Sequence, residues 1–218
     1  VFQDQEKGRV QVEGSGPCGF FRRFIEGRPP QDMERLSFGV SKQLNWDFVH
    51  ERCDPREIFP IWHRLAQLTL YKAEEEEGTL LAACGNDLQP YLDLYRAGFE
   101  SLLVPRAQDA DYQGFKYPPA RHPLAVVGAG LRLRRLFLDQ ARILPFLPPQ
   151  FPAGRLTRAK TPFGLLDLEW SKKQIRRMVL EVGQSGEIAF DFKGVKHFRL
   201  RLSPQNRGRV CSVEERLT

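Results

Sequence analysis

Hydrophobic and polar residues alternate with a period of two along the last third of the chain. Such alternation is typical of strands that bury one face. Short polar or glycine-containing links at 171–174, 183–186 and 193–194 separate the runs, which predicts an antiparallel meander. The apolar face of a meander has to be covered by a second sheet or by helices. The apolar positions of the four runs are Leu166, Leu168 and Trp170; Met178, Leu180 and Val182; Ile188, Phe190 and Phe192; and Phe198, Leu200 and Leu202.

Upstream, from Ser41 to Asp139, the apolar spacing changes toward 3.6 and predicts three helices. The first begins at Asp54-Pro55, with an aspartate N-cap, proline at N1 and Glu57 able to reach back to the cap. Pro60 is predicted to restart this helix after one turn. The other two helices are expected over 87–103 and 122–139. The expected buried face of the first helix consists of Ile58, Ile61, Trp62, Leu65 and Leu68.

Glycines and prolines add detail to this arrangement. Gly128 and Gly130 lie inside the third helix, and they predict a close approach by a neighbouring element. The segment 144–152 contains several prolines but also large apolar residues, so we expect it to pack against the sheet rather than act as a linker. Helices before strands predict an α+β fold. Its parts are a poorly patterned segment 1–40, a helical region 41–140 and an antiparallel β-sandwich 141–218.

Composition adds few constraints. The chain has 218 residues and a net charge of +6, which requires neither nucleic acid nor a membrane surface as a partner. No apolar run approaches the roughly 20 residues that span a bilayer, and no targeting segment is visible. The chain opens without Met, so we expect it to begin inside a longer precursor. The cysteines form no C-x-x-C pair and indicate no zinc site, and Cys84 is expected in the core.

The stretch from the third helix to the strand of Trp170 carries a resemblance to a known family. The helix is followed by Ile143-Leu144-Pro145-Phe146-Leu147-Pro148-Pro149, then by Phe151-Pro152-Ala153-Gly154, and then by Leu168-Glu169-Trp170. This order resembles the end of the six-hairpin glycosidases, particularly the bacterial α-L-fucosidase-like branch, over roughly residues 122–202. The resemblance implies that 41–140 is the end of an α/α barrel. It also implies a glycoside hydrolase-like protein whose N-terminal portion is missing from this chain, with a carbohydrate ligand and no metal or cofactor.

The chain departs from that family where its catalytic aspartate would lie, in the loop that enters the last long helix. Residues 117–123 carry no carboxylate there. The nearest acids are Asp109 and Asp111, which become the candidate catalytic base and its helper, because inverting hydrolysis needs two carboxyl groups about 6.5–9.5 Å apart. The same long segment offers substrate-binding candidates, namely Tyr112, Gln113, Phe115, Arg121 and His122. A solvated turn is the alternative interpretation of these acids.

A second cluster consists of Trp46, Asp47, His50 and Glu51. Trp46 is a further substrate-binding candidate, because its ring could stack on a sugar. Trp62 is expected in the core, with His63 as a surface imidazole beside it. Arginines on the third helix and basic residues on the final strands could follow a phosphate backbone, but they lack interleaved exposed aromatic residues. Edge lysines and arginines that prevent sheet aggregation are the simpler explanation, so the sequence disfavours nucleic acid as a partner. The alternative to a degenerate glycoside hydrolase is a non-catalytic glycan- or protein-binding β-sandwich module.

Overall fold

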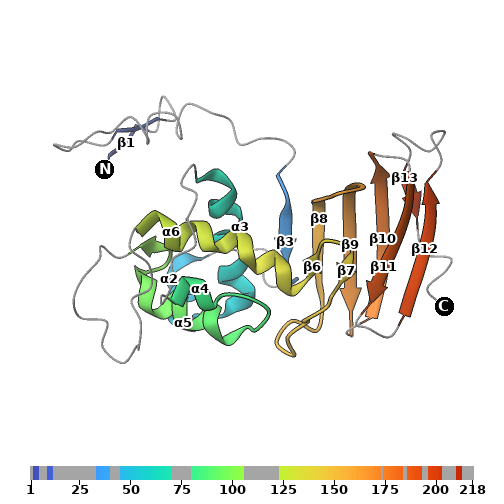
Figure 1. Cartoon of the computed structure of the whole chain (residues 1–218). Coiled ribbons are helices and arrows are strands. Elements are labelled where there is room, and N and C mark those ends of the chain that lie inside the picture. The colour runs from blue at the N-terminus through green and yellow to red at the C-terminus, as the bar shows by residue number, and fades with distance from the viewer. Residues whose placement is uncertain are drawn as a thin grey trace.

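The computed structural model describes residues 2–4, 9–11, 33–39, 45–69, 80–105, 123–172, 174–183, 186–192, 196–202 and 210–212. Helices gather at one end of the molecule and the long strands at the other (Figure 1). The helices are α2 Trp46–Arg52, α3 Pro55–Leu68, α4 Leu80–Ala83, α5 Gln89–Gly98, α6 Pro123–Gly128 and the 3-10 helix η1 Ala129–Leu136. The expectation of a mixed α+β fold is confirmed.

Two larger sheets form the other end of the molecule. The first has five antiparallel strands in the order β13-β10-β9-β8-β3, and the second has four in the order β12-β11-β7-β6. Two small hairpins, β1–β2 and β4–β5, complete the strands of the described residues. Their bounds are β1 Phe2–Asp4, β2 Arg9–Gln11, β3 Arg35–Ser37, β4 Phe99–Ser101, β5 Val104–Pro105, β6 Leu138–Asp139, β7 Arg142–Ile143, β8 Gly154–Thr161, β9 Gly164–Ser171, β10 Gln174–Val182, β11 Gly186–Phe192, β12 Lys196–Leu202 and β13 Val210–Ser212.

The four predicted strands exist as β9, β10, β11 and β12, but the prediction of a single meander is wrong. β9 pairs with β10 and β11 pairs with β12, both antiparallel. β10 does not pair with β11, because β13 occupies the second edge of β10 while β11 pairs in parallel with β7. The chain therefore changes sheets between Val182 and Gly186. Period-two patterning determines the buried face of a strand but not its neighbours.

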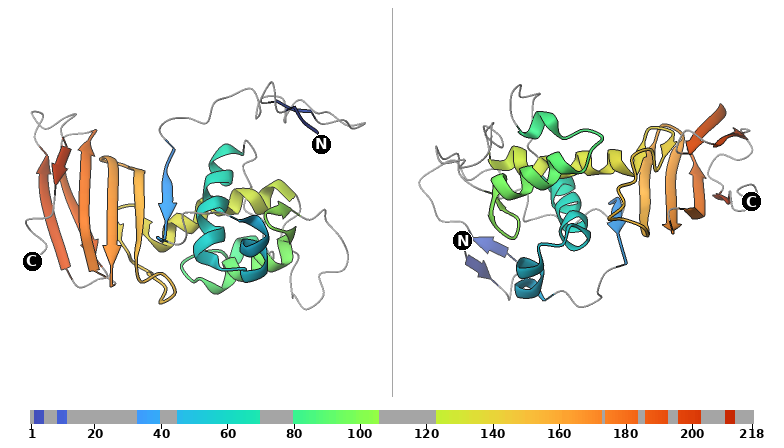
Figure 2. Two further views of the ribbon diagram at one scale, coloured as in Figure 1. Left: turned by 180° about the vertical axis from the view of Figure 1, so that it is seen from behind. Right: turned by 90° about the horizontal axis from the view of Figure 1, so that it is seen from below.

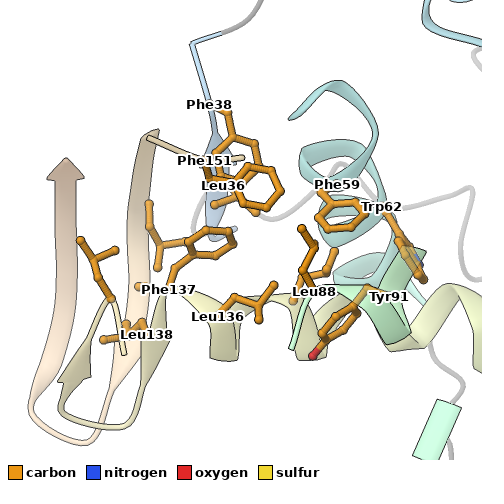
Figure 3. Close-up of a cluster of buried hydrophobic side chains, with 14 of the residues drawn as sticks. Leu36, Phe38, Phe59, Trp62, Leu88, Tyr91, Leu136, Phe137, Leu138 and Phe151 are labelled. Carbon is orange, nitrogen blue, oxygen red and sulfur yellow. The ribbon is translucent and has the colours of Figure 1, made fainter. Parts of the chain in front are cut away.

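One hydrophobic core runs through both ends of the molecule. The apolar faces of β9 and β10 belong to the same buried cluster as the inner faces of α3, α5 and η1. Strand β3 lies between the helices and the rest of its sheet (Figure 2). Phe38, which follows β3, stacks on Phe151 with ring centroids 4.3 Å apart and lies 5.2 Å from the ring of Phe137 (Figure 3). The segment 33–39 thus fills the junction between helices and sheet.

Helix α3 begins as predicted but differs inside. The Asp54 side chain accepts from the Arg56 N–H at 2.9 Å, which confirms the N-cap. Glu57 does not reach back to the cap, because both of its oxygens accept from the guanidinium of Arg52. Pro60 does not restart the helix: α3 is continuous over 14 residues, although proline cannot donate a backbone hydrogen bond at that position. Its fully buried residues are Ile58, Phe59, Trp62, His63 and Ala66, so the buried face is rotated from the predicted one.

The other two helices are shorter or tighter than predicted. The second ends at Gly98, and the chain then forms the hairpin β4–β5 instead of continuing to Leu103. The third consists of α6 followed by eight residues of 3-10 helix, and it ends at Leu136. Gly130 has the predicted close neighbour, because a Cβ there would lie 2.6 Å from the Trp62 carbonyl oxygen. The segment 144–152 packs as expected, with Leu144 and Phe151 fully buried.

Candidate functional site

A polar cluster lies buried where β3, α3 and η1 meet. It contains Glu34, His63, Gln67 and Arg134. Glu34 precedes β3, His63 and Gln67 lie one turn apart on α3, and Arg134 lies on η1. The side chains of His63 and Glu34 are only 2% and 9% exposed, so this cluster is a concentration of ionisable groups inside the protein.

The imidazole of His63 is engaged at both nitrogens. Nδ1 lies 2.9 Å from the Gly130 carbonyl oxygen, and Nε2 lies 3.1 Å from Glu34 Oε1. Since a carbonyl oxygen can only accept, Nδ1 carries a proton and donates it to Gly130. A second proton lies between Nε2 and the carboxyl group. The expectation that His63 is a surface imidazole is wrong, because β3 and η1 cover it.

Gln67 and Arg134 complete the partners of Glu34. The Gln67 side-chain amide pairs with the Glu34 backbone: its Oε1 accepts from the Glu34 N–H at 3.0 Å, and its Nε2 donates to the Glu34 carbonyl at 2.9 Å. This pairing resembles one rung of a β-ladder. Arg134 Nε lies 3.3 Å from Glu34 Oε2 without forming an aligned hydrogen bond, while its Nη2 donates to the Lys160 carbonyl on β8.

This cluster joins elements rather than performing chemistry. A general base needs a ring nitrogen within reach of a substrate, and both nitrogens of His63 are bound to protein groups. Glu57, the other buried carboxylate among the residues that the structure describes, is held by Arg52 at 2.6 Å. Buried carboxylates that are paired with cations are poor candidates for a protonated general acid. We therefore assign the cluster a structural role, which is to fix β3 against α3 and η1.

The two elements that flank the segment 106–122 in the sequence pack against each other, and this segment contains most of the candidate site residues. It leaves β5 at Pro105 and enters α6 at Pro123, and α6 contacts β5. Trp62 anchors this junction, because its indole Nε1 lies 3.0 Å from the carbonyl oxygens of both Val126 and Val127. Gly98 lets α5 approach α6 so closely that a Cβ there would overlap the Val126 side chain.

Aromatic rings surround this anchor. Trp62 lies 5.4 Å from the ring of Phe99 and 6.1 Å from that of Tyr95, measured between centroids. Partial burial raises the pKa of the Tyr95 hydroxyl to about 12, so that hydroxyl is a neutral donor at ordinary pH. A rigid base of this kind is where binding segments are commonly carried.

The candidate residues of that segment lie outside the described residues. They are Asp109, Asp111, Tyr112, Gln113, Phe115, Arg121 and His122. Trp46 is the first residue of α2, and its side chain is not described either. In the same helix His50 and Glu51 are exposed. The catalytic and substrate-binding assignments therefore stay predictions.

No group of three or more His, Cys, Asp or Glu side chains in the described part of the chain is placed to hold a metal ion. Cys84 is buried, as expected, and burial raises the pKa of its thiol to about 12. Its Sγ contacts the Leu80 carbonyl at 3.5 Å, and it has the surroundings of a packing residue rather than a nucleophile.

Sequence reasoning missed Glu34 and Arg134. A signal for the first was present, since Leu36 and Phe38 alternate with Arg35 and Ser37 in a pattern typical of a strand. Arg134 looked like one of several exposed arginines on the third helix, and no sequence signal distinguishes it from Arg135.

Neither a scan against protein-family models nor a search of curated proteins gives a match to this chain. Across the residues that the structure describes, no helix combines the length and apolarity needed to cross a bilayer.

Proposed function

We propose that this chain is the C-terminal portion of a glycoside hydrolase-like protein of the α-L-fucosidase-like kind, with carbohydrate as its ligand. In this proposal the helices are the end of an α/α barrel, and the two sheets form the β-sandwich that follows it. The segment 106–122 contributes the sugar contacts, with Asp109 or Asp111 as the carboxylate base. The general acid comes from the N-terminal portion of the protein.

One observation carries the proposal, namely that the residues behind the resemblance pack on one another. Trp170 Nε1 donates to the Phe151 carbonyl at 3.1 Å, and both side chains are buried. Gly154 lies under the same indole, where a Cβ would be 2.8 Å from Cη2 of Trp170. The turn from helix to sheet, the glycine and the tryptophan therefore form one structural unit, which is what shared ancestry of this stretch would require.

The base of 106–122 gives the second support. Trp62 binds the backbone of α6 and packs on Phe99 of β4, Gly98 lies against Val126, and α6 contacts β5, so the elements that flank the candidate segment are fixed to one another. Sugar binding by a long segment needs such a support, because ordering a free loop on binding costs conformational entropy.

The test is a thermal melt of the full chain with a panel of monosaccharides that includes L-fucose. A ligand that binds only the folded state raises Tm by mass action, about 2.7 kcal/mol of stabilisation at one hundred times Kd. We expect one sugar to raise Tm and the substitution Asp111→Ala to remove the shift. Asp87→Ala, an exposed acid outside 106–122, is the matched control and should keep it. No shift with any sugar would oppose the proposal.

A second candidate function is a non-catalytic module that binds glycans or a protein. This function is favoured because both buried carboxylates of the described residues, Glu34 and Glu57, are paired with cationic side chains. The two candidates separate by activity: aryl-glycoside hydrolysis by the full-length protein that Asp109→Asn or Asp111→Asn abolishes would exclude the non-catalytic module.

A further inference from the structure

The outer face of the five-stranded sheet is open and rich in arginine. Register and burial place one side of β8, β9 and β10 in the core and leave the other side exposed or half-exposed. In the view from behind (Figure 2, left), no helix covers these three strands. The cationic residues of this outer face are Arg35, Arg155, Arg158, Lys160, Arg176 and Arg177.

The acidic residues of the outer face already have partners. Glu169 on β9 pairs with Arg155 on β8 at 2.9 Å, and Glu181 on β10 lies 3.3 Å from Arg158. The Asp167 side chain accepts from the Arg158 backbone N–H at 2.7 Å. These carboxylates therefore neutralise only part of the positive charge.

The remaining cations have no such partners. Arg35 on β3, Lys160 on β8 and Arg176 on β10 are exposed. None of the three forms an ion pair with an acid in the part of the chain that the structure describes. The outer face is thus an unpartnered sheet surface with an excess of positive charge, which is complementary to an anionic partner.

Two β-bulges add arginines to this face. On β8, Thr157 and Arg158 together oppose one residue of β9, and both are half-exposed instead of alternating between the two faces. On β10, Arg176 and Arg177 together oppose one residue of β9, and both are exposed. A bulge inserts an extra residue into one strand and redirects its side chain. Each bulge therefore presents one more guanidinium group on the outer face than regular alternation would.

Arg158 has an unusual backbone conformation in its bulge. Its φ is 58°, in the left-handed region that favours glycine. β8 is an interior strand, between β3 and β9, so protection of a sheet edge does not explain an arginine at this position. Strained residues of this kind are concentrated at functional sites, and this one lies at the centre of the basic face.

We propose that the outer face of the five-stranded sheet binds an acidic polysaccharide, one whose sugars carry carboxylate groups. Arg155 and Arg177 lie in one row across the strands, on either side of Glu169. Neighbouring strands lie about 4.8 Å apart, so the Cα atoms of these two arginines are about 10 Å apart. A polymer laid across the strands meets several guanidinium groups, each of which binds a carboxylate through two parallel hydrogen bonds.

Nucleic acid fits this face less well. The outward positions of the described strands β3, β8, β9 and β10 carry no aromatic side chain on which bases could stack. A flat sheet face also offers no protruding element to enter a major groove. The inference rests on the proposed function for the choice of a carbohydrate, and on the charge of the face for the choice of an acidic one.

The test measures the Kd of the full chain for polygalacturonate, a polymer with one carboxylate per sugar, at low salt. The double variant Arg35→Gln, Arg176→Gln removes two exposed cations of the face, and we expect Kd to rise by about 2- to 30-fold. The matched control is Arg64→Gln, Arg96→Gln, which removes two exposed arginines from α3 and α5 and gives the same net charge. The control should bind polygalacturonate as the wild type does.

Three results would overturn the proposal: no binding of polygalacturonate, equal loss of affinity in both double variants, or tighter binding of single-stranded DNA than of polygalacturonate at the same salt concentration. Thermal melts show whether the variants fold, and Arg35→Gln against Arg64→Gln repeats the comparison without a change in either bulge. The arginine variants should keep the Tm shift caused by a monosaccharide, so failure of this proposal is distinguishable from failure of the proposed function.

Discussion

The buried cluster at Glu34 allows a sharp test of how β3 is held. The substitution Glu34→Gln keeps the size of the side chain and removes its charge. It leaves Arg134 beside an uncharged amide and takes the carboxylate away from His63. The Gln67 amide still pairs with the backbone of residue 34, so the local chain path has no reason to change.

Burial determines the size of the effect. The side chains of His63, Glu34 and Arg134 are 2%, 9% and 27% exposed, so solvent replaces little of the lost interaction. Removing one partner of a buried ionic group costs about 3–5 kcal/mol, because the remaining charge stays desolvated. For a chain of this size each 1 kcal/mol lowers Tm by about 2–4 °C, which gives a fall of about 6–20 °C.

Glu57→Gln is the matched control. Glu57 is as buried as Glu34, with 4% of its side chain exposed, but its partner Arg52 is 49% exposed and can be solvated when the charge is lost. We expect a cost of about 1 kcal/mol or less. Urea unfolding followed by tryptophan fluorescence compares the two variants. If Glu34→Gln is no more destabilising than Glu57→Gln, the cluster does not hold β3 through its charges.

Three further predictions concern packing, thiol chemistry and capping. Gly154→Ala places a methyl group 2.8 Å from Cη2 of the buried Trp170 ring, and we expect it to lower the free energy of unfolding by about 1–3 kcal/mol. An unchanged midpoint of urea unfolding would contradict this packing. Burial raises the pKa of the Cys84 thiol to about 12, so iodoacetamide at pH 8 should alkylate the exposed Cys53 in the native protein and Cys84 only in denaturant. Peptide mass spectrometry measures both alkylation rates, and equal rates for the two cysteines in the native protein would refute this. Asp54→Ala removes the N-cap of α3 and should cost about 1 kcal/mol at pH 7. The hydrogen bond from Arg56 lowers the pKa of Asp54 below its ordinary 3.8. The difference in stability between Asp54→Ala and the wild type should therefore shrink as the pH falls through that range and the carboxylate is protonated. A constant difference in Tm from pH 7 to pH 2.5 would argue against this.

Local patterns in the sequence were sufficient to predict several elements. The N-cap of α3 followed from Asp54-Pro55 because capping depends only on neighbouring backbone groups. The strands β9 and β10 followed from alternation, since a half-buried strand needs it at every second residue. The close approach at Gly130 could also be predicted, because a glycine inside an apolar helix face usually has a packing reason.

Pairing between distant segments could not be predicted in the same way. The sequence predicted a meander, yet β10 pairs with β13 and β11 with β7, because which strand occupies a free edge depends on the whole sheet. His63 looked like a surface residue on α3, and its burial depends on Glu34, 29 residues earlier, and on Gly130, 67 residues later. The 3-10 form of η1 likewise reflects anchors on several other elements rather than its own residues.

The sequence by itself therefore determined the N-cap of α3, the helical character of three segments and the strands β9 to β12, with the apolar faces of β9 and β10. Those properties come from interactions within a few residues, and the periods of 3.6 and 2 record them. Only the tertiary structure decided the strand order, the burial of the Glu34–His63–Arg134 cluster and the place of 33–39 between helices and sheet. Each of these depends on contacts between segments far apart in the chain, whose free energy is gained only when all partners are assembled.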